Sequence, residues 1–225
     1  MSDAKSQILG RIRGSLKRDA LPAATVAALD ERLARHARNL LPQRVARDPA
    51  ALVALFVEMA TAANTEVTRL AALADVPGAV ATLLARENLP AELVASPALA
   101  DLPWAERPLL TVRFDRAHGR DAVSVTPAFA AIAETGTLML VSGADTPSTL
   151  NFLPDTHVVV LKAKDVVGPY EDALDRLRAR SANGELPRTI NFVTGPSRTG
   201  DIEQTIQLGA HGPRRLHILL VEDDG

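Results

Sequence analysis

Three apolar runs decide the fold: HVVVLK at residues 157–162, TINFVTG at residues 189–195 and LHILLVE at residues 216–222. Apolar side chains follow one another in these runs instead of alternating with polar ones, as a strand buried on both faces requires. Helices must then cover both sides of the sheet. Because helix-like and strand-like segments alternate and are joined by short connections, we expect an α/β fold with an open, mostly parallel sheet and helices on both faces.

The rest of the chain supplies further elements of this kind. Pro49 suits the first position of a helix that ends near Asn64, and Pro108 precedes the next strand-like run. The loop of residues 101–108 is a connector with little structure of its own. Strands are predicted at residues 66–70, 92–95, 109–114, 122–126, 138–142, 157–162, 189–194 and 216–221, and helices at residues 49–64, 76–87, 128–133, 170–180 and 201–208.

Composition excludes several classes of protein. The 225 residues are 23 % charged and 47 % hydrophobic, with a formal net charge of −2 and no cysteine. These values argue against a disordered chain, a collagen-like chain or a highly charged nucleic-acid binder. Without cysteine there is no disulfide, no thiol nucleophile and no thiolate ligand for zinc or an iron–sulfur cluster. No segment approaches the about 20 apolar residues of a membrane span, and the N-terminus lacks a secretory signal, so we expect a cytoplasmic protein.

Residues 1–47 differ from residues 48–225 in charge. The first segment holds 10 Lys and Arg against 4 Asp and Glu, whereas the second holds 15 against 23. Apolar residues recur at helical spacing in the first segment, with Pro22 before the second helix and Pro42 after it. We therefore expect an N-terminal helical arm, residues 1–47, and an α/β domain, residues 48–225. The arm packs on its own domain, on a second copy in a homo-oligomer, or on an acidic partner protein. Nucleic acid is disfavoured because no aromatic residue lies among the basic ones.

Three polar turns that contain glycine are the candidate sites, because ligands of open α/β sheets bind at the carboxyl ends of strands, where helix N-termini and loop amides converge. The first is Glu134-Thr135-Gly136-Thr137, in which Gly136 permits a turn with positive φ. Glu134 is either a solvated side chain in an ordinary turn or a proton acceptor, nucleophile or substrate anchor.

The second turn follows the TINFV strand and leads into the predicted helix of residues 201–208. Free main-chain amides at a helix start suit an anion, and Arg198 would strengthen a site for a carboxylate. Asp201 and Glu203 already complement the helix dipole, so dense phosphate is disfavoured against a single carboxylate, a hydroxyl-rich ligand or a bridged cation. A capped helix start without ligand is the alternative. The turn contains Gly195, Pro196, Ser197, Arg198, Thr199, Asp201 and Glu203.

The third turn, Gly209-Ala210-His211-Gly212-Pro213, fixes the chain around one imidazole, so the direction of His211 matters. His157 is read as a histidine at the start of a strand. The spacing of His, Asp and Glu fits no zinc or EF-hand motif, and phosphate-loop and dinucleotide fingerprints are absent, so neither a metal nor a cofactor is expected.

In this order the turns resemble the lactate-utilisation protein C family, which is built on the LUD domain. The family usually has Gly at the position of Ser124, and Ala at the position of Gly200, and Ser124 could alter a tight contact. The resemblance rests on TPAFAAIAETGTLML at 126–140, LPDTHVVVL at 153–161, FVTGPSRTGDIE at 192–203 and LGAHGPRRLHILLVED at 208–223, and extends to LVALFVEMA at 52–60 and ILGRIRGSL at 8–16.

The resemblance implies a fold similar to the NagB/RpiA/CoA-transferase group and a role in oxidising L-lactate to pyruvate with iron–sulfur partner proteins. It also implies which residues line the site. Glu134 and His211 would be the catalytic candidates. The substrate-binding candidates would be Thr135, Gly136, Thr137, Gly195, Pro196, Ser197, Arg198, Thr199, Asp201, Glu203 and Gly212.

Three hypotheses follow for the function. In the first, the chain is a non-redox subunit of a lactate-oxidising system: Arg198 holds a small carboxylate in a cleft, and His211 acts as a base or orients it. In the second, the chain is a stand-alone acyl or CoA transferase, with Glu134 in the E-T-G turn as nucleophile. In the third, it is a non-catalytic regulator or scaffold that docks through its basic arm.

Overall fold

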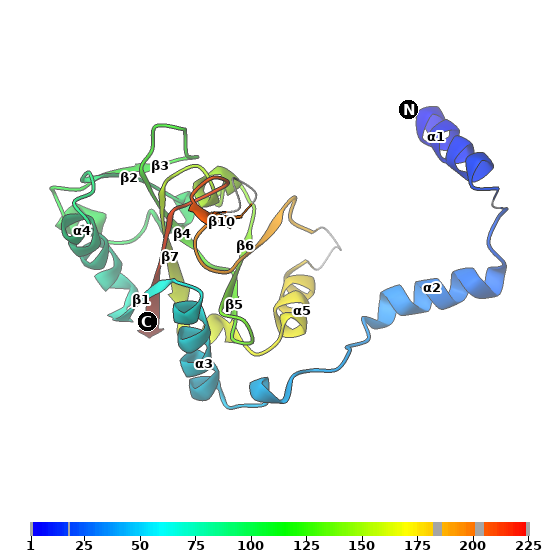
Figure 1. Ribbon diagram of the computed structural model, residues 1–225, viewed down its shortest axis with the longest axis horizontal. Coiled ribbons are helices and arrows are strands. Elements are labelled where there is room, and N and C mark those ends of the chain that lie inside the picture. The colour runs from blue at the N-terminus through cyan, green and yellow to red at the C-terminus, as the bar shows by residue number, and fades with distance from the viewer. Residues whose placement is uncertain (1, 18, 182–185, 201–204, 224–225) are drawn as a thin grey trace. The chain divides into compact units, whose positions relative to one another are not determined.

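The core of the protein is a parallel sheet of six strands. A computed structural model describes residues 2–17, 19–181, 186–200 and 205–223. The strand order is β1-β12-β7-β4-β2-β3, and every neighbouring pair is parallel. This confirms the predicted architecture, with the apolar runs of β7 and β12 at the centre (Figure 1). The strands are β1 (Glu66–Ala72), β2 (Glu92–Ala95), β3 (Thr111–Phe114), β4 (Val123–Pro127), β7 (Thr156–Lys162) and β12 (Arg215–Asp223).

Both faces of this sheet are covered, because successive side chains of a strand point to opposite sides. Val158 and Val160 of β7 pack with helix α4 (Val76–Arg86) on one face. Val159 packs on the other face with helix α3 (Pro49–Ala62) and a second sheet. Asp48 caps α3 by accepting a hydrogen bond of 2.9 Å from the Ala51 amide, and Pro49 occupies the first turn, as predicted.

The second sheet has the strand order β8-β5-β6-β9. It corrects one prediction: residues 128–133 form no helix, and β5 (Ala130–Ile132) pairs instead with β6 (Thr137–Val141) and β8 (Val166–Val167). Alanine favours a helix, but tertiary packing overrides this local preference, and here Ala130 and Ala131 pack on opposite faces of β5. Strand β6 also pairs with β9 (Ile190–Val193), and helix α5 (Tyr170–Arg180) covers the outer face of this second sheet.

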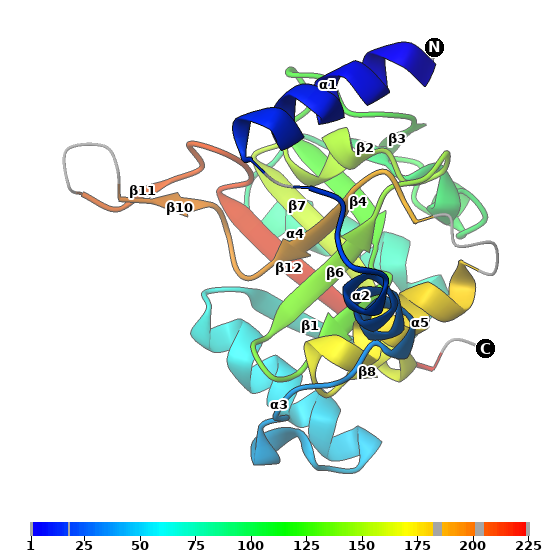
Figure 2. The same cartoon turned by 90° about the vertical axis from the view of Figure 1, so that its right-hand side faces the viewer.

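The predicted helix at 201–208 is also wrong where the chain is described. Residues 201–204 lie outside the described residues, and β11 (Gln207–Leu208) pairs with β10 (Arg198–Thr199) in an antiparallel hairpin. Figure 2 shows this hairpin extending away from the sheets. In the described part of the segment Ile206 and Leu208 are both exposed, so these two residues do not hold a helix against the domain.

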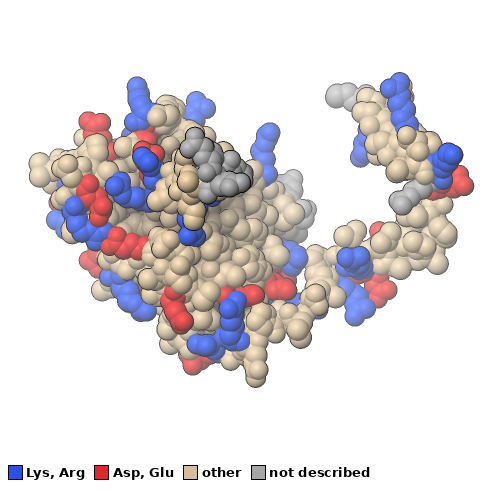
Figure 3. Space-filling model, in the orientation of Figure 1, with Lys and Arg blue, Asp and Glu red and all other residues tan. Residues whose placement is uncertain are grey.

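The chain divides into two compact units, Met1–Leu40 and Leu41–Gly225. The first contains α1 (Ser2–Ser15) and α2 (Ala23–Arg35), which exposes its apolar side chains, including Leu33 at 72 %. Val45 belongs to the core beside α3. On the visible face of the larger unit, cationic and anionic side chains are mixed (Figure 3). Among the described residues, no helix has the length and apolar character needed to cross a membrane.

Short 3-10 turns complete the domain. One of them, η5, carries Asn151 to the site described below. The turns are η1 (Gln43–Val45), η2 (Leu73–Asp75), η3 (Pro97–Leu99), η4 (Trp104–Glu106), η5 (Ser148–Asn151) and η6 (Ala163–Asp165).

Candidate functional site

A pocket of about 400 Å³ lies where the second and third turns of the sequence meet. It borders the amino ends of β7 and β12 and the carboxyl end of β9. The predicted position at the carboxyl ends of the parallel strands is therefore wrong: β7 and β12 contribute their amino ends, and only β9, in the second sheet, contributes its carboxyl end. The lining residues are Asn151, Phe152, His157, Phe192, Val193, Thr194, Gly195, Pro196, Ser197, Arg198, His211, Gly212, Pro213 and Leu216.

Main-chain hydrogen bonds hold the two turns together. The Ser197 amide donates to the Pro213 carbonyl at 2.9 Å, and the Gly209 amide donates to the Ser197 carbonyl at 3.0 Å. The His211 amide lies 3.4 Å from Ser197 Oγ, while its imidazole is exposed at the rim. Arg198, which also lines the pocket, is exposed as well. The structure thus brings together six of the predicted residues: Gly195, Pro196, Ser197, Arg198, His211 and Gly212.

Gly195 fixes the pocket wall against the end of α3. Its φ of +72° lies in the left-handed region, and a Cβ there would stand 2.2 Å from the carbonyl oxygen of Ala63. Gly136 has the same relation to this helix: its φ is +66°, and a Cβ would stand 2.3 Å from the Ala60 nitrogen. Both glycines therefore permit a turn and a close approach to one helix end.

The first turn reaches the pocket through a series of hydroxyl groups. Thr137 Oγ1 lies 2.6 Å from Thr194 Oγ1, and Thr194 lines the pocket. Thr135 Oγ1 lies 2.6 Å from Thr137 Oγ1 and 3.0 Å from the Tyr170 hydroxyl. Tyr170 also packs on Phe192, with ring centroids 5.4 Å apart. Thr135 and Thr137 thus support the wall from behind.

Two further predicted residues that the structure describes, Glu134 and Thr199, do not line the pocket. Glu134 is partly exposed, its amide donates to the Gly168 carbonyl at 3.2 Å, and it is not among the described residues that line the pocket. Its role as a nucleophile stays a prediction. Thr199 pairs within the β10–β11 hairpin. Asp201 and Glu203 lie outside the described residues.

His157 is the main site residue that sequence reasoning missed. It is fully buried in the pocket wall, and its Nε2 lies 2.7 Å from Thr126 Oγ1 on β4. Its Nδ1 has no hydrogen-bond partner among the described residues. Burial lowers the pKa of His157 to about 3, so the ring is neutral near pH 7. The available signal was a histidine within a run expected to be buried on both faces, since such a residue needs polar partners.

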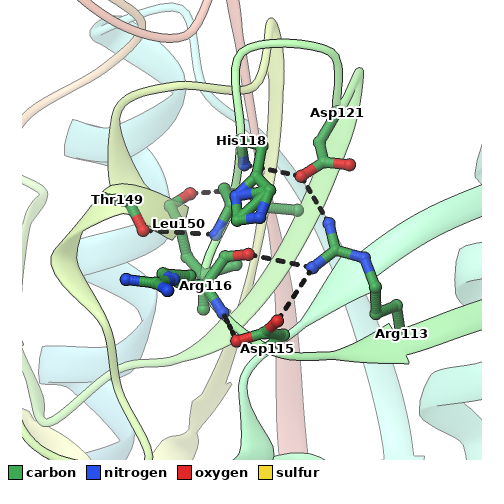
Figure 4. A network of polar contacts seen from close by, with 9 residues as sticks. Arg113, Asp115, Arg116, His118, Asp121, Thr149 and Leu150 are labelled. Carbon is green, nitrogen blue, oxygen red and sulfur yellow. Dashed lines mark hydrogen bonds and ion pairs between the residues drawn. The ribbon is translucent and has the colours of Figure 1, made fainter.

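Another polar network holds the η5 wall of the pocket. The buried Ser124 donates a hydrogen bond of 2.6 Å to the Leu150 carbonyl, which a glycine could not do. The Ala117 amide donates to Thr149 Oγ1 at 3.2 Å. Figure 4 shows how Arg113 closes the neighbouring turn by donating to Asp121 at 2.6 Å. The contact expected at Ser124 is therefore a bond that anchors η5.

The described part of the chain contains no group of three or more His, Cys, Asp or Glu side chains placed to hold a metal ion. The pocket instead combines the Arg198 guanidinium, hydroxyl groups of Thr194 and Ser197, two imidazoles and the apolar Phe152, Phe192 and Leu216. Such a mixture can bind a small anion that also carries an uncharged polar group and an apolar part.

Comparisons with known proteins agree with this architecture. Residues 53–221 match the model of the LUD domain. "Lactate utilization protein C" of Bacillus subtilis (strain 168) is 35 % identical over 102 residues, which cover 45 % of this chain and 42 % of that protein. The protein of the same name from Deinococcus radiodurans is 34 % identical over 158 residues, or 66 % of this chain and 69 % of that protein. The chain thus spans less than half the length of the Bacillus subtilis relative.

A solved structure supports the fold. The crystal structure of a "duf162 family protein" from Deinococcus radiodurans superimposes with a TM-score of 0.58 at 26 % identity, covering 78 % of this chain and 99 % of that one. Residues 53–221, which match the LUD domain model, include the second sheet, α4, every described residue that lines the pocket, and the parallel sheet except the last two residues of β12. The chain belongs to the LUD domain family.

Proposed function

We propose that this protein is a non-redox component of an L-lactate utilisation system, and that it binds a small carboxylate in the pocket between the two sheets. The observation that carries the proposal is the pocket itself, because two distant turns shared with the family meet there around Arg198. The relatives named lactate utilization protein C support the pathway. Iron–sulfur partner proteins would transfer the electrons, since the sequence contains no cysteine to ligate a cluster.

The pocket suits such a ligand in size and chemistry. A volume of about 400 Å³ lies near the lower end of ligand pockets. Arg198 at the rim can bind both oxygens of a carboxylate, and the exposed His211 beside it can orient the ligand or accept a proton. The aromatic rings of Phe152 and Phe192 offer apolar surface for a short carbon chain.

Calorimetric titration of the purified protein with L-lactate and pyruvate tests the binding. We expect saturable binding by the wild type and at least a tenfold loss of affinity in Arg198→Ala, since a carboxylate–guanidinium pair is removed. Arg120→Ala is the matched control, because Arg120 lies outside this pocket. Unchanged affinity in Arg198→Ala would contradict the assignment of the carboxylate.

Growth and co-purification experiments test whether the protein belongs to an L-lactate utilisation system. A strain without the protein should lose growth on L-lactate, and the tagged protein should co-purify with iron–sulfur proteins. Removal of residues 1–40 asks whether the arm makes that contact, and this boundary is preferred because Val45 belongs to the domain core. If the partners remain bound to the shortened chain, the arm is not the docking element. Normal growth of the deletion strain on L-lactate would refute the role.

A further inference from the structure

The Thr126–His157 pair gives the pocket a polar group whose hydrogen-bonding character is not fixed. His157 Nε2 lies 2.7 Å from Thr126 Oγ1, and both side chains are buried. His157 lines the pocket, and its Nδ1 is buried and has no partner among the described residues. A buried polar atom without a partner costs stability, and a ligand in the pocket can provide the missing bond.

A neutral imidazole has one nitrogen that donates and one that accepts, and a hydroxyl group can do either. If Nε2 carries the hydrogen, it donates to Thr126 Oγ1 and leaves Nδ1 as an acceptor. If the Thr126 hydroxyl donates to Nε2, then Nδ1 carries the hydrogen and becomes a donor. The same pair can therefore present either character without any change of charge.

We propose that His157 is the positioning residue for the 2-oxygen of the ligand and that it serves both the 2-hydroxy and the 2-oxo acid. The inference rests on the proposed carboxylate function of the same pocket. Nδ1 accepts a hydrogen bond from the hydroxyl of the hydroxy acid and donates one to the carbonyl of the oxo acid. Arg198 at the rim holds the carboxylate of either form. No proton leaves the protein when the two ligands exchange.

Nuclear magnetic resonance of the full chain, labelled with ¹⁵N at histidine, tests the tautomers directly. We expect the His157 Nδ1 resonance of a nitrogen without hydrogen in the L-lactate complex and of a nitrogen with hydrogen in the pyruvate complex. The same tautomer at saturation with both ligands would overturn the proposal, as would a His157 resonance that neither ligand moves.

The variant Thr126→Val tests whether the threonine hydroxyl allows His157 to change between its two tautomers. Valine cannot donate to Nε2, so the variant should lose affinity for pyruvate and lactate unequally and change their affinity ratio at least fivefold. Thr126→Ser restores a hydroxyl and should restore the ratio. Thr68→Val is the matched control, because Thr68 bonds the other buried histidine, His217, at 2.9 Å and lies outside this pocket.

The outcomes separate this inference from the function on which it rests. A wild type that binds neither ligand refutes both. A wild type that binds both, with an unchanged ratio in Thr126→Val, overturns the role of the Thr126–His157 pair and leaves the carboxylate site standing. If Thr126→Val is unstable, the resonance measurement on the wild type decides alone, since it needs no substitution.

Discussion

Two buried histidines, His157 on β7 and His217 on β12, lie on neighbouring strands of the parallel sheet but point to opposite faces. The register pairs His157 with Leu216, so the next residue, His217, faces the other side. Each histidine uses Nε2 to bond a threonine on an adjacent strand, at 2.7 Å for Thr126 and at 2.9 Å for Thr68. Their surroundings differ in charge.

His217 lies in a balanced group of charges. Its Nδ1 is 3.3 Å from Glu66 Oε2, and Arg86 bonds the same carboxylate. Burial lowers the pKa of His217, while Glu66 opposes this change, and the hydrogen bond from Arg86 lowers the pKa of Glu66. His157 has no such carboxylate among the causes of its shift, and burial alone brings its pKa to about 3. Both histidines line pockets, so what distinguishes them is charge: His217 has the Glu66 carboxylate beside it at the edge strand β1, whereas burial acts on His157 alone.

The largest difference between the two faces of the parallel sheet should come from replacing one glycine on each face with alanine. Gly195→Ala places a Cβ against the Ala63 carbonyl at a positive φ, so we expect about 3 kcal/mol or more of destabilisation. In Gly78→Ala the nearest atom is the end of the flexible Arg107 side chain, and alanine favours the helix, so the change should stay within about 1 kcal/mol. Urea unfolding measures both. Equal costs would show that the contact with α3 does not hold the pocket wall.

The two histidines should also differ in how strongly each makes the stability of the protein depend on pH. The pKa of His157 rises from about 3 in the folded protein to 6.5 when unfolded, so the unfolded chain binds more protons between these values. Stability should therefore fall as the pH is lowered from 6.5, by up to about 1.4 kcal/mol per pH unit. His157→Gln should flatten this slope more than His217→Gln does.

The measurement belongs between pH 5 and 7, by urea unfolding at each pH. The contribution of Glu66, whose folded pKa is below 4.5, is fully present above that value and is lost only as the pH falls further. A slope that His157→Gln leaves unchanged would argue against an uncompensated neutral histidine in the folded state.

Removal of one side-chain hydroxyl on each face of the parallel sheet should change stability less. Ser124→Ala leaves the buried Leu150 carbonyl without its donor and should cost about 1–2 kcal/mol. Thr82→Ala removes an exposed hydroxyl that bonds the Gly78 carbonyl within α4, and should cost less than about 0.5 kcal/mol. Thermal unfolding compares the two. If both variants match the wild type, η5 does not depend on Ser124.

Glu66→Gln should change stability by less than about 1 kcal/mol, because the ion pair with Arg86 is half exposed. It should nevertheless lower the pKa of His217 further, since the carboxylate that favours its charged form is gone. Histidine resonances followed through a pH titration report this change. A simultaneous change in the pKa of His157 would show that the two faces are coupled through the sheet.

The sequence predicted the parallel sheet because its central strands carry a local signature, an unbroken apolar run such as that of β7. The second sheet was harder to predict from the sequence. Residues 130–132 are short and rich in alanine, so their state depends on pairing with β6 and β8, which local composition does not reveal. The hairpin of β10 and β11 was missed for the same reason.

The candidate site was predicted where residue type and turn chemistry indicate it, as for Gly195, Arg198 and His211. His157 was not predicted as a site residue, because its environment forms only when β4 and β7 pair and bring Thr126 beside its ring. The glycines were expected to permit turns, and their positive φ values confirm this. Their approach to α3 depends on tertiary packing, and no local pattern contains it.

The common support of Gly136 and Gly195 on the last turn of α3 has a consequence for engineering. Gly136 approaches the main chain at Ala60 and Gly195 approaches the carbonyl of Ala63, so a displacement of this helix end would move both turns at once. Attempts to change ligand preference should leave this helix end untouched. Phe152 and Phe192, which line the pocket and are about two-fifths exposed at 42 % and 43 %, are the positions at which libraries of variants can reshape the pocket.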